Sequence, residues 1–287
     1  MIATVLLGMA IGSIYVFVAV GYNLTWLTSR VINFAQGGLM VVGMFLTVNL
    51  YERHVPIVLV FVILALVGAV LASVELIVAI LPIINRGSHA ELVTTVGAMT
   101  VIQGIIGILV VASSETVPFF GPTSLISVSG SSLTPDELIL IPLAVVVGLG
   151  AHFWSARTKS GLAAVSLSED KDAALVLGVN TRRFTFIAFM VSGALGLAVA
   201  PFVGPETTAV VSLATTFAVY GFVVLAIAGV GSQLGAVIGG LAIGIVQQIV
   251  ARYLGPNWQN LAIFAIFLAF LMMRPTGLFG ERRERVV

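Results

Sequence analysis

The chain has 287 residues, of which 59% are hydrophobic and 9% are charged, and its formal net charge is +1. Its mean hydropathy is +1.16, whereas soluble domains contain about 25% charged residues. A soluble fold of this length could not bury so much apolar surface, so we expect lipid around the chain. No basic stripe alternates with aromatic residues, which argues against nucleic acid as a partner. With no cysteine, disulfides and thiolate metal sites are excluded.

Several apolar stretches have the length of a membrane helix, roughly 20 residues. They lie near 2–27, 31–51, 56–74, 92–112, 138–156, 184–203 and 257–273. The first has no basic residue before Arg30, unlike a signal peptide, so we expect it to be a retained span.

The region 213–251 is also apolar, but "GVGSQLG" (229–235) divides it into two short segments. These either both cross the membrane or dip into it and return to the same face. The predicted fold is an all-α integral membrane protein, a polytopic helical bundle of about 8–9 membrane segments, some broken or re-entrant. It forms a single transmembrane domain over 1–287.

The distribution of basic residues predicts the orientation. With this set of spans, eleven of the 13 Lys and Arg residues fall on the side of the C-terminus, and only Arg53 and Arg252 fall on the other. Positive charge favours the cytosolic side, so we expect the N-terminus outside and the C-terminus in the cytosol. The loop 113–137, which has no Lys or Arg, is then external, and the loop 157–183 is cytosolic.

The cytosolic loop contains "SEDKDAALVLGVNTRR" (168–183), with six charged residues in sixteen. Ser166 and Glu169 have the spacing of a capping box, which begins a helix. Gly178 is placed to end that helix in a left-handed conformation. A helix of about ten residues is marginal alone in water, so the loop predicts a partner protein at the cytosolic face.

The chain shows little sign of chemistry of its own. Its two lysines, Lys159 and Lys171, do not follow the glycine pattern of a P-loop, and no nucleophile–base pair stands out. We therefore expect no enzymatic activity. The spans are almost free of charge, which disfavours ion-coupled transport. Glu75 is the arguable exception, since it lies either at the cytosolic end of its span or inside the bilayer.

Neutral polar residues inside the spans are candidates for a translocation path: Asn33, Gln36, Thr94, Thr95 and Gln103. Most glycines are expected to serve close helix packing. The cluster "GVGSQLG" instead suggests broken backbone, so Gly229, Gly231 and Gly235 are hinge candidates.

Six segments in order carry a resemblance to a known family. They are "GSIYVFVAVGYNLTW" (12–26), "VINFAQGGLMVVGMF" (31–45), "ELVTTVGAMTVIQG" (91–104), the stretch 163–204, "AIAGVGSQLGAVIGGLAIGIV" (226–246) and "RPTGLFG" (274–280). The chain resembles the permease subunits of bacterial branched-chain amino-acid ABC importers, of the LivH type within the LivH/LivM family.

The resemblance implies a multi-pass protein of the bacterial plasma (inner) membrane that has no cofactor. It implies a second permease subunit of the LivM type, two cytosolic ATP-binding subunits that supply the energy, and an extracytoplasmic solute-binding protein. It also implies that part of the cytosolic loop is a coupling helix docking on the ATPase. The coupling candidates are Ser168, Glu169, Asp170, Asp172, Ala173, Ala174, Leu177, Gly178 and Asn180.

The sequence departs from the family where His-Gly-Glu is replaced by Gln36-Gly37-Gly38. Because the family includes relatives that handle urea and short amides, the resemblance implies a branched-chain amino acid or a related small amino acid or amide as the solute. A stand-alone secondary transporter or channel for a small neutral solute, and a purely structural membrane subunit, remain alternative readings.

Overall fold

The computed structural model describes residues 1–83, 90–110, 114–121, 126–128, 131–274 and 276–279. Parts of the predicted external loop 113–137 lie outside these residues. The α-helices are α1 (Ile2–Ser29), α2 (Ala35–Glu52), α3 (Ile57–Glu75), α4 (Ala90–Leu109), α5 (Pro135–Arg157), α6 (Lys159–Glu169), α7 (Lys171–Val176), α8 (Thr181–Ala198), α9 (Ala200–Thr207), α10 (Leu213–Ala228), α11 (Gln233–Tyr253) and α12 (Gln259–Met273). A π-helical turn, Leu76–Ile80, extends α3, and a 3-10 turn, Pro256–Trp258, precedes α12.

The helical membrane architecture predicted from composition is confirmed, with one small addition. A two-stranded antiparallel hairpin pairs β1 (Ile126–Val128) with β2 (Ser131–Leu133) in the loop before α5. It lies in the segment whose Pro, Gly and Ser content argued against regular structure, and it is only three residues long on each side.

By length and hydropathy, six helices among the described residues can cross a membrane, or seven if α8 and α9 count as one bent span. Helices are the natural outcome, because in lipid each backbone N–H and C=O needs a partner within its own segment. The prediction of 8–9 segments stays a prediction, since it requires α2 and the 16-residue α10 to cross as well.

Two predicted segments differ from the structure. The region 213–251 does not hold two short helices, because α11 has 21 residues and is long enough to cross a membrane; only α10 is short. The span predicted at 184–203 is broken by 45° between α8 and α9. Pro201 lies in the first turn of α9, where a proline ring cannot extend the preceding helix.

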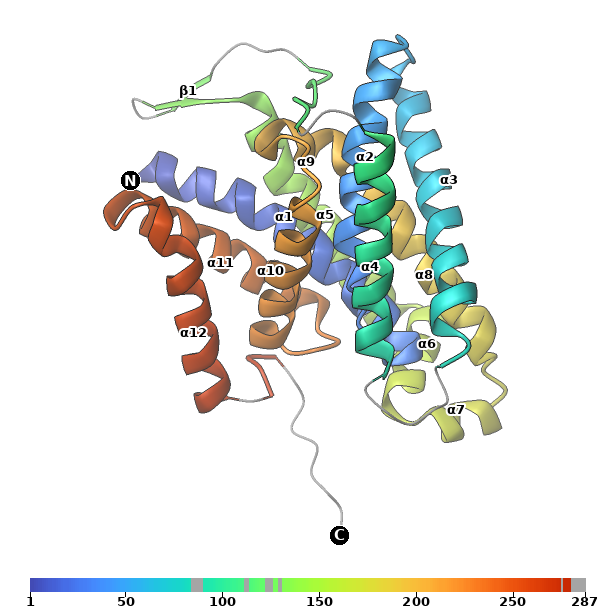
Figure 1. Cartoon of the computed structure of the whole chain (residues 1–287). Coiled ribbons are helices and arrows are strands. Elements are labelled where there is room, and N and C mark those ends of the chain that lie inside the picture. Colours follow the sequence, from blue (N-terminus) through green and yellow to red (C-terminus); the bar gives the residue numbers. More distant parts are fainter. Residues whose placement is uncertain (84–89, 111–113, 122–125, 129–130, 275, 280–287) are drawn as a thin grey trace.

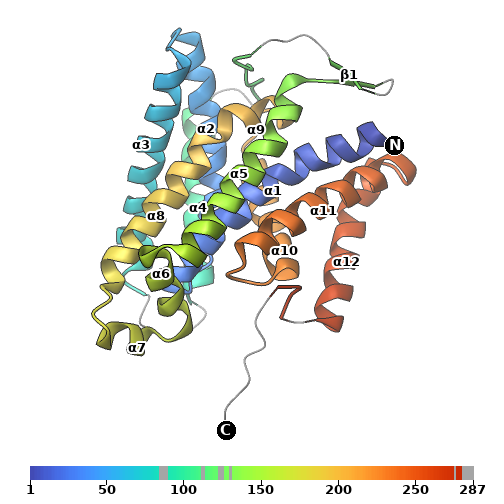
Figure 2. The same cartoon turned by 180° about the vertical axis from the view of Figure 1, so that it is seen from behind.

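α1 is the central element of the bundle. It crosses the molecule obliquely, packs along α11, and also contacts α5, α8 and α10 (Figures 1 and 2). α3 packs along α8 at one side of the bundle. One buried cluster surrounds α1, α2, α10 and α11, and a second lies between α2, α3 and α8. The α6–α7 segment lies at one end of the bundle and the β1–β2 hairpin at the other (Figure 1).

Candidate functional site

The charged segment folds as two short helices rather than one helix of ten residues. α6 runs through Glu169, and α7 has only six residues. The predicted capping box is wrong: Ser166 and Glu169 both lie inside α6, and the Ser166 hydroxyl donates to the Ala163 carbonyl oxygen. Asp170 caps α7 instead, because its Oδ1 accepts the N–H groups of Asp172 and Ala173, each at 3.0 Å.

The predicted end of this helix at Gly178 is confirmed. Gly178 has φ +85°, in the left-handed region that glycine adopts without strain. Its N–H donates to the Leu175 carbonyl oxygen at 2.9 Å, and the Val179 N–H donates to the Ala174 carbonyl oxygen at 3.0 Å. These two bonds form a Schellman motif, so the turn after α7 has a defined shape.

We call the segment from the last turn of α6 through α7 to Asn180 the projection. Its tip is apolar and exposed. Val176 is 89% exposed and Leu177 is 81% exposed, whereas Ala174 is buried. All nine coupling candidates lie on this projection, between the last turn of α6 and Asn180, whose side chain caps α8 by accepting the Arg183 N–H. The docking role predicted for these nine residues stays a prediction.

Arg30 belongs to this site, although the sequence suggested only a role in orientation. It follows the last turn of α1, and its guanidinium donates to the Ser168 carbonyl oxygen at 2.8 Å and to the Glu169 carbonyl oxygen at 2.6 Å. A cation at the C-terminal carbonyls of a helix is favoured by the helix dipole. Arg30 therefore ties the end of α6 to the end of the central helix.

The path candidates Asn33 and Gln36 are completely enclosed by neighbouring helices. Asn33 Nδ2 donates to Glu75 Oε2 at 3.0 Å, and Asn33 Oδ1 accepts the Ala35 N–H where α2 begins. Glu75 is 7% exposed, five residues before the end of the span that continues through the π-helical turn. Its Oε1 has no hydrogen-bond partner among the described residues.

Gln36 links α2 to α8 through its amide. Its Nε2 donates to the Ser192 carbonyl oxygen at 3.0 Å, and its Oε1 accepts the Ser192 hydroxyl at 2.9 Å. The amide occupies a slot between Gly21 of α1 and Gly196 of α8, where a Cβ atom on either glycine would lie 2.7 Å from Nε2. Gln36 therefore cross-links α2 to α8 and packs against Gly21 of α1.

The other path candidates do not join this cluster around a shared cavity. The Thr95 hydroxyl donates to the Ile32 carbonyl oxygen at 3.2 Å, and Thr94 bonds only within its own helix, to Ala90. Gln103 lies further along α4, where its Nε2 donates to the Val211 carbonyl oxygen and to Thr215 Oγ1. The proposed path through these five residues stays a prediction.

Two of the three hinge candidates, Gly229 and Gly231, lie in the turn between α10 and α11. Gly229 and Gly231 have φ values of +97° and +91°, and Gly235 lies in the first turn of α11. The turn is held firmly: Asn23 Oδ1 accepts the Gly231 N–H at 2.7 Å and Asn23 Nδ2 donates to the Ser232 carbonyl oxygen at 3.0 Å. A hinge role for these glycines likewise stays a prediction.

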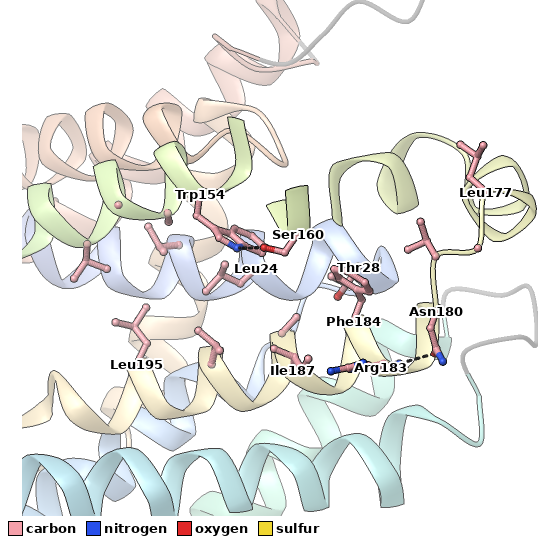
Figure 3. A pocket seen from close by; sticks show the side chains of 18 residues that line it. Leu24, Thr28, Trp154, Ser160, Leu177, Asn180, Arg183, Phe184, Ile187 and Leu195 are labelled. Carbon is pink, nitrogen blue, oxygen red and sulfur yellow. Dashed lines mark hydrogen bonds between the residues drawn. The ribbon is translucent and has the colours of Figure 1, made fainter. Parts of the chain in front are cut away.

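An apolar cavity of about 900 Å³ opens on the side of the bundle. Its floor is α1, and its walls are α5 and α8, which both pack on α1 (Figure 3). Sequence reasoning did not find it, because most of its lining comes from three helices that are distant along the chain.

No group of three or more His, Asp or Glu residues in the described part of the chain could hold a metal ion.

Fold and composition together define a multi-pass helical membrane protein. The family described as branched-chain amino acid transport system / permease component matches residues 4–272, and the chain belongs to this family. The predicted resemblance to LivH-type permeases is therefore confirmed.

Curated relatives agree over nearly the whole chain. It is 22% identical to the high-affinity branched-chain amino acid transport system permease protein BraD of Pseudomonas aeruginosa, over 96% of this chain and 94% of that protein. It is 24% identical to the corresponding LivH protein of Escherichia coli strain K12, with the same coverage. It is 26% identical to a probable LivH permease of Methanocaldococcus jannaschii, over 93% of this chain and 89% of that protein.

Among solved structures, PsaBC from Streptococcus pneumoniae in complex with Fab has a similar chain. The TM-score is 0.54 at 9% identity, over 96% of this chain and 92% of that one. At this identity the likeness concerns the fold alone.

Proposed function

We propose that this chain is the membrane-spanning permease subunit of a bacterial ABC importer for branched-chain amino acids or a related small amino acid or amide. ATP hydrolysis takes place on two cytosolic partner subunits, and a LivM-type permease and an extracytoplasmic solute-binding protein complete the assembly. The relatives' names support the solute class.

The observation that carries this proposal is the projection formed by α6, α7 and the Gly178 turn. Within it, Asp170 caps the start of α7 and Gly178 ends that helix, so α7 has a defined conformation. Val176 and Leu177 form the exposed tip. Arg30 links its base to the central helix. A push on the tip by an ATPase therefore acts on the end of α1, and such a rigid element can bias two access states of the bundle.

Gly178→Pro tests the coupling role. Proline cannot adopt φ +85° and removes the N–H bonded to Leu175, so the turn must change shape. In the complete transporter reconstituted in vesicles, we expect solute uptake to fall at least tenfold while ATP hydrolysis continues. Gly255→Pro is the matched control, because Gly255 has φ +97° and free space around it but connects α11 to α12, away from α7. Normal solute-stimulated hydrolysis and uptake in Gly178→Pro would contradict the coupling role.

The orientation can be tested with single cysteines, because the chain has none of its own. Val176→Cys at the tip of the projection should react with a membrane-impermeant maleimide only after the cells are permeabilised. Tyr253→Cys, at the end of α11, is exposed and should react in intact cells. The reverse pattern would place the projection outside and exclude coupling to a cytosolic ATPase.

One observation favours the alternative of a stand-alone transporter. Glu75 is a buried carboxylate with one unpartnered oxygen, the kind of residue that ion-coupled carriers use. The importer proposal predicts no uptake by the chain reconstituted alone, with or without an ion gradient. Uptake under these conditions would establish the alternative.

A further inference from the structure

The cavity between α1, α5 and α8 is apolar along most of its length and polar at one end. Figure 3 shows Leu195 at one end of the cavity, Ile187 between the ends, and Arg183 and Asn180 at the other end. The cavity is open to the surroundings of the bundle, since Ile187 is 47% exposed and Val191 is 49% exposed on its wall. It is therefore a lateral groove in the membrane-facing surface.

The groove has the length of one lipid leaflet. Arg183 and Leu195 are both in α8, and at a rise of about 1.5 Å per residue they are about 18 Å apart along the helix. Half of the hydrocarbon core of a bilayer is about 15 Å thick. The apolar part of the groove can therefore hold an extended acyl chain from one membrane surface to near the midplane.

The polar end offers positive charge and hydrogen-bond donors. The exposed side chain of Arg183 lines this end, and the first turn of α8, capped by Asn180, presents backbone N–H groups there. A helix N-terminus favours anions. Trp154 lines the α5 wall of the groove, where its indole N–H donates to Ser160 Oγ at 3.1 Å (Figure 3).

We propose that this groove binds one anionic phospholipid, with an acyl chain along α1, α5 and α8 and the phosphate at Arg183 and the N-terminus of α8. Basic pockets between membrane helices are a recognised kind of site for anionic headgroups. The charged Arg183 and the polar Asn180 at one end of the groove favour a lipid headgroup over the apolar face of a partner helix.

The bound headgroup would also touch the projection described above. Leu177, Gly178 and Val179 line the same polar end of the groove. The lipid therefore supports the turn from the membrane side. The binding proposal itself does not depend on the proposed transport function, and its test measures binding without ATP or solute.

The test uses the full chain, with any subunits that copurify, in bilayer nanodiscs. A trace of phosphatidylglycerol with a photoreactive diazirine in its acyl chain is activated, and the labelled peptides are mapped by mass spectrometry. We expect labelling to concentrate on α1, α5 and α8, and a phosphatidylcholine tracer to label these peptides about fivefold less, the usual effect of one basic side chain on an anionic headgroup.

Two variants address the two halves of the site. Gly150→Leu fills the groove, and nothing lies within 4 Å of a Cβ at this position, so the chain has room for the substitution. It should reduce groove labelling with both tracers at least fivefold. Arg183→Gln should reduce labelling with the phosphatidylglycerol tracer to the level seen with phosphatidylcholine.

The matched controls are Gly97→Leu, also with nothing within 4 Å but on α4, and Arg182→Gln, adjacent to Arg183 but not lining the groove. Neither should change groove labelling. Labelling spread evenly over α4 and the groove, or unaffected by Gly150→Leu and Arg183→Gln, would overturn the proposal. Loss of labelling whenever a partner subunit is present would show that a protein covers the groove instead.

Discussion

Two sets of glycines in this molecule have opposite surroundings. Where α1 crosses α11, Gly8 and Gly12 meet backbone: a Cβ on Gly8 would lie 2.6 Å from Ile245 Cα, and one on Gly12 would lie 2.6 Å from Gly240 O. On α4, Gly97, Gly104 and Gly107 have nothing within 4 Å of an added Cβ. Both sets lie in long apolar helices, so composition does not distinguish them.

The difference separates the closed centre of the bundle from an open face. In the centre, small residues let two backbones touch, which is how membrane helices gain packing energy without a hydrophobic driving force. On α4 the same residue type leaves a smooth outer surface and contributes nothing to packing within the chain. The central crossing should therefore carry much of the stability, and the α4 face should carry little.

Gly244→Ala should have the largest effect. A methyl group at this position overlaps the backbone of Gly8 and Gly12, so α11 has to move away from α1. We expect the free energy of unfolding to fall by about 3 kcal/mol or more, at the upper end of overpacking effects. Unfolding of the purified chain by SDS titration in mixed micelles measures it. A stability equal to the parent's would mean that the two helices do not cross at these glycines.

Gln36→Leu should have an intermediate effect. The substitution roughly preserves volume but removes the hydrogen bonds that join α2 to Ser192, and interhelical bonds of this kind contribute about 1 kcal/mol in membranes. The same SDS titration measures the loss. Gln103→Leu is the control, because Gln103 also bonds across helices but is only partly buried on α4. A larger loss of stability in Gln103→Leu than in Gln36→Leu would show that the α4 side contributes more to stability than the centre of the bundle.

Gly104→Ala should have the smallest effect. It adds the same methyl group as Gly244→Ala, but into open space, and alanine is the better helix former. We expect the stability of the chain to stay within about 0.5 kcal/mol of the parent or to rise slightly. A loss comparable to that of Gly244→Ala, seen in the isolated chain, would show that the α4 face is packed and would remove the contrast.

Local chemistry predicted some features well and others poorly. Gly178 was identifiable because a left-handed turn after an apolar run strongly favours glycine. The start of α7 was misplaced because Ser166-x-x-Glu169 and Asp170 offer competing caps within a few residues. Only the continuation of α6 through Glu169, with Arg30 at its last carbonyls, decides in favour of Asp170.

The polar cluster marks the limit of sequence reasoning. Asn33 and Gln36 were recognisable as polar residues inside a span, which indicates a special role but not which one. Their partners Glu75 and Ser192 are 42 and 156 residues away, respectively. No local pattern encodes such a pairing, so the use of Gln36 as a cross-link between α2 and α8 was not predictable.

The sequence by itself determined that lipid surrounds the chain, that the fold is helical, where the charged segment lies and which family the chain belongs to. Each of these depends on composition or on a short local pattern. Lipid requires long apolar helices whatever their arrangement. The tertiary structure alone decided which glycines meet another backbone, which amides meet a partner, and where α5 and α8 leave a groove over α1. These depend on how the helices cross, and crossing is set by contacts between residues far apart in the chain.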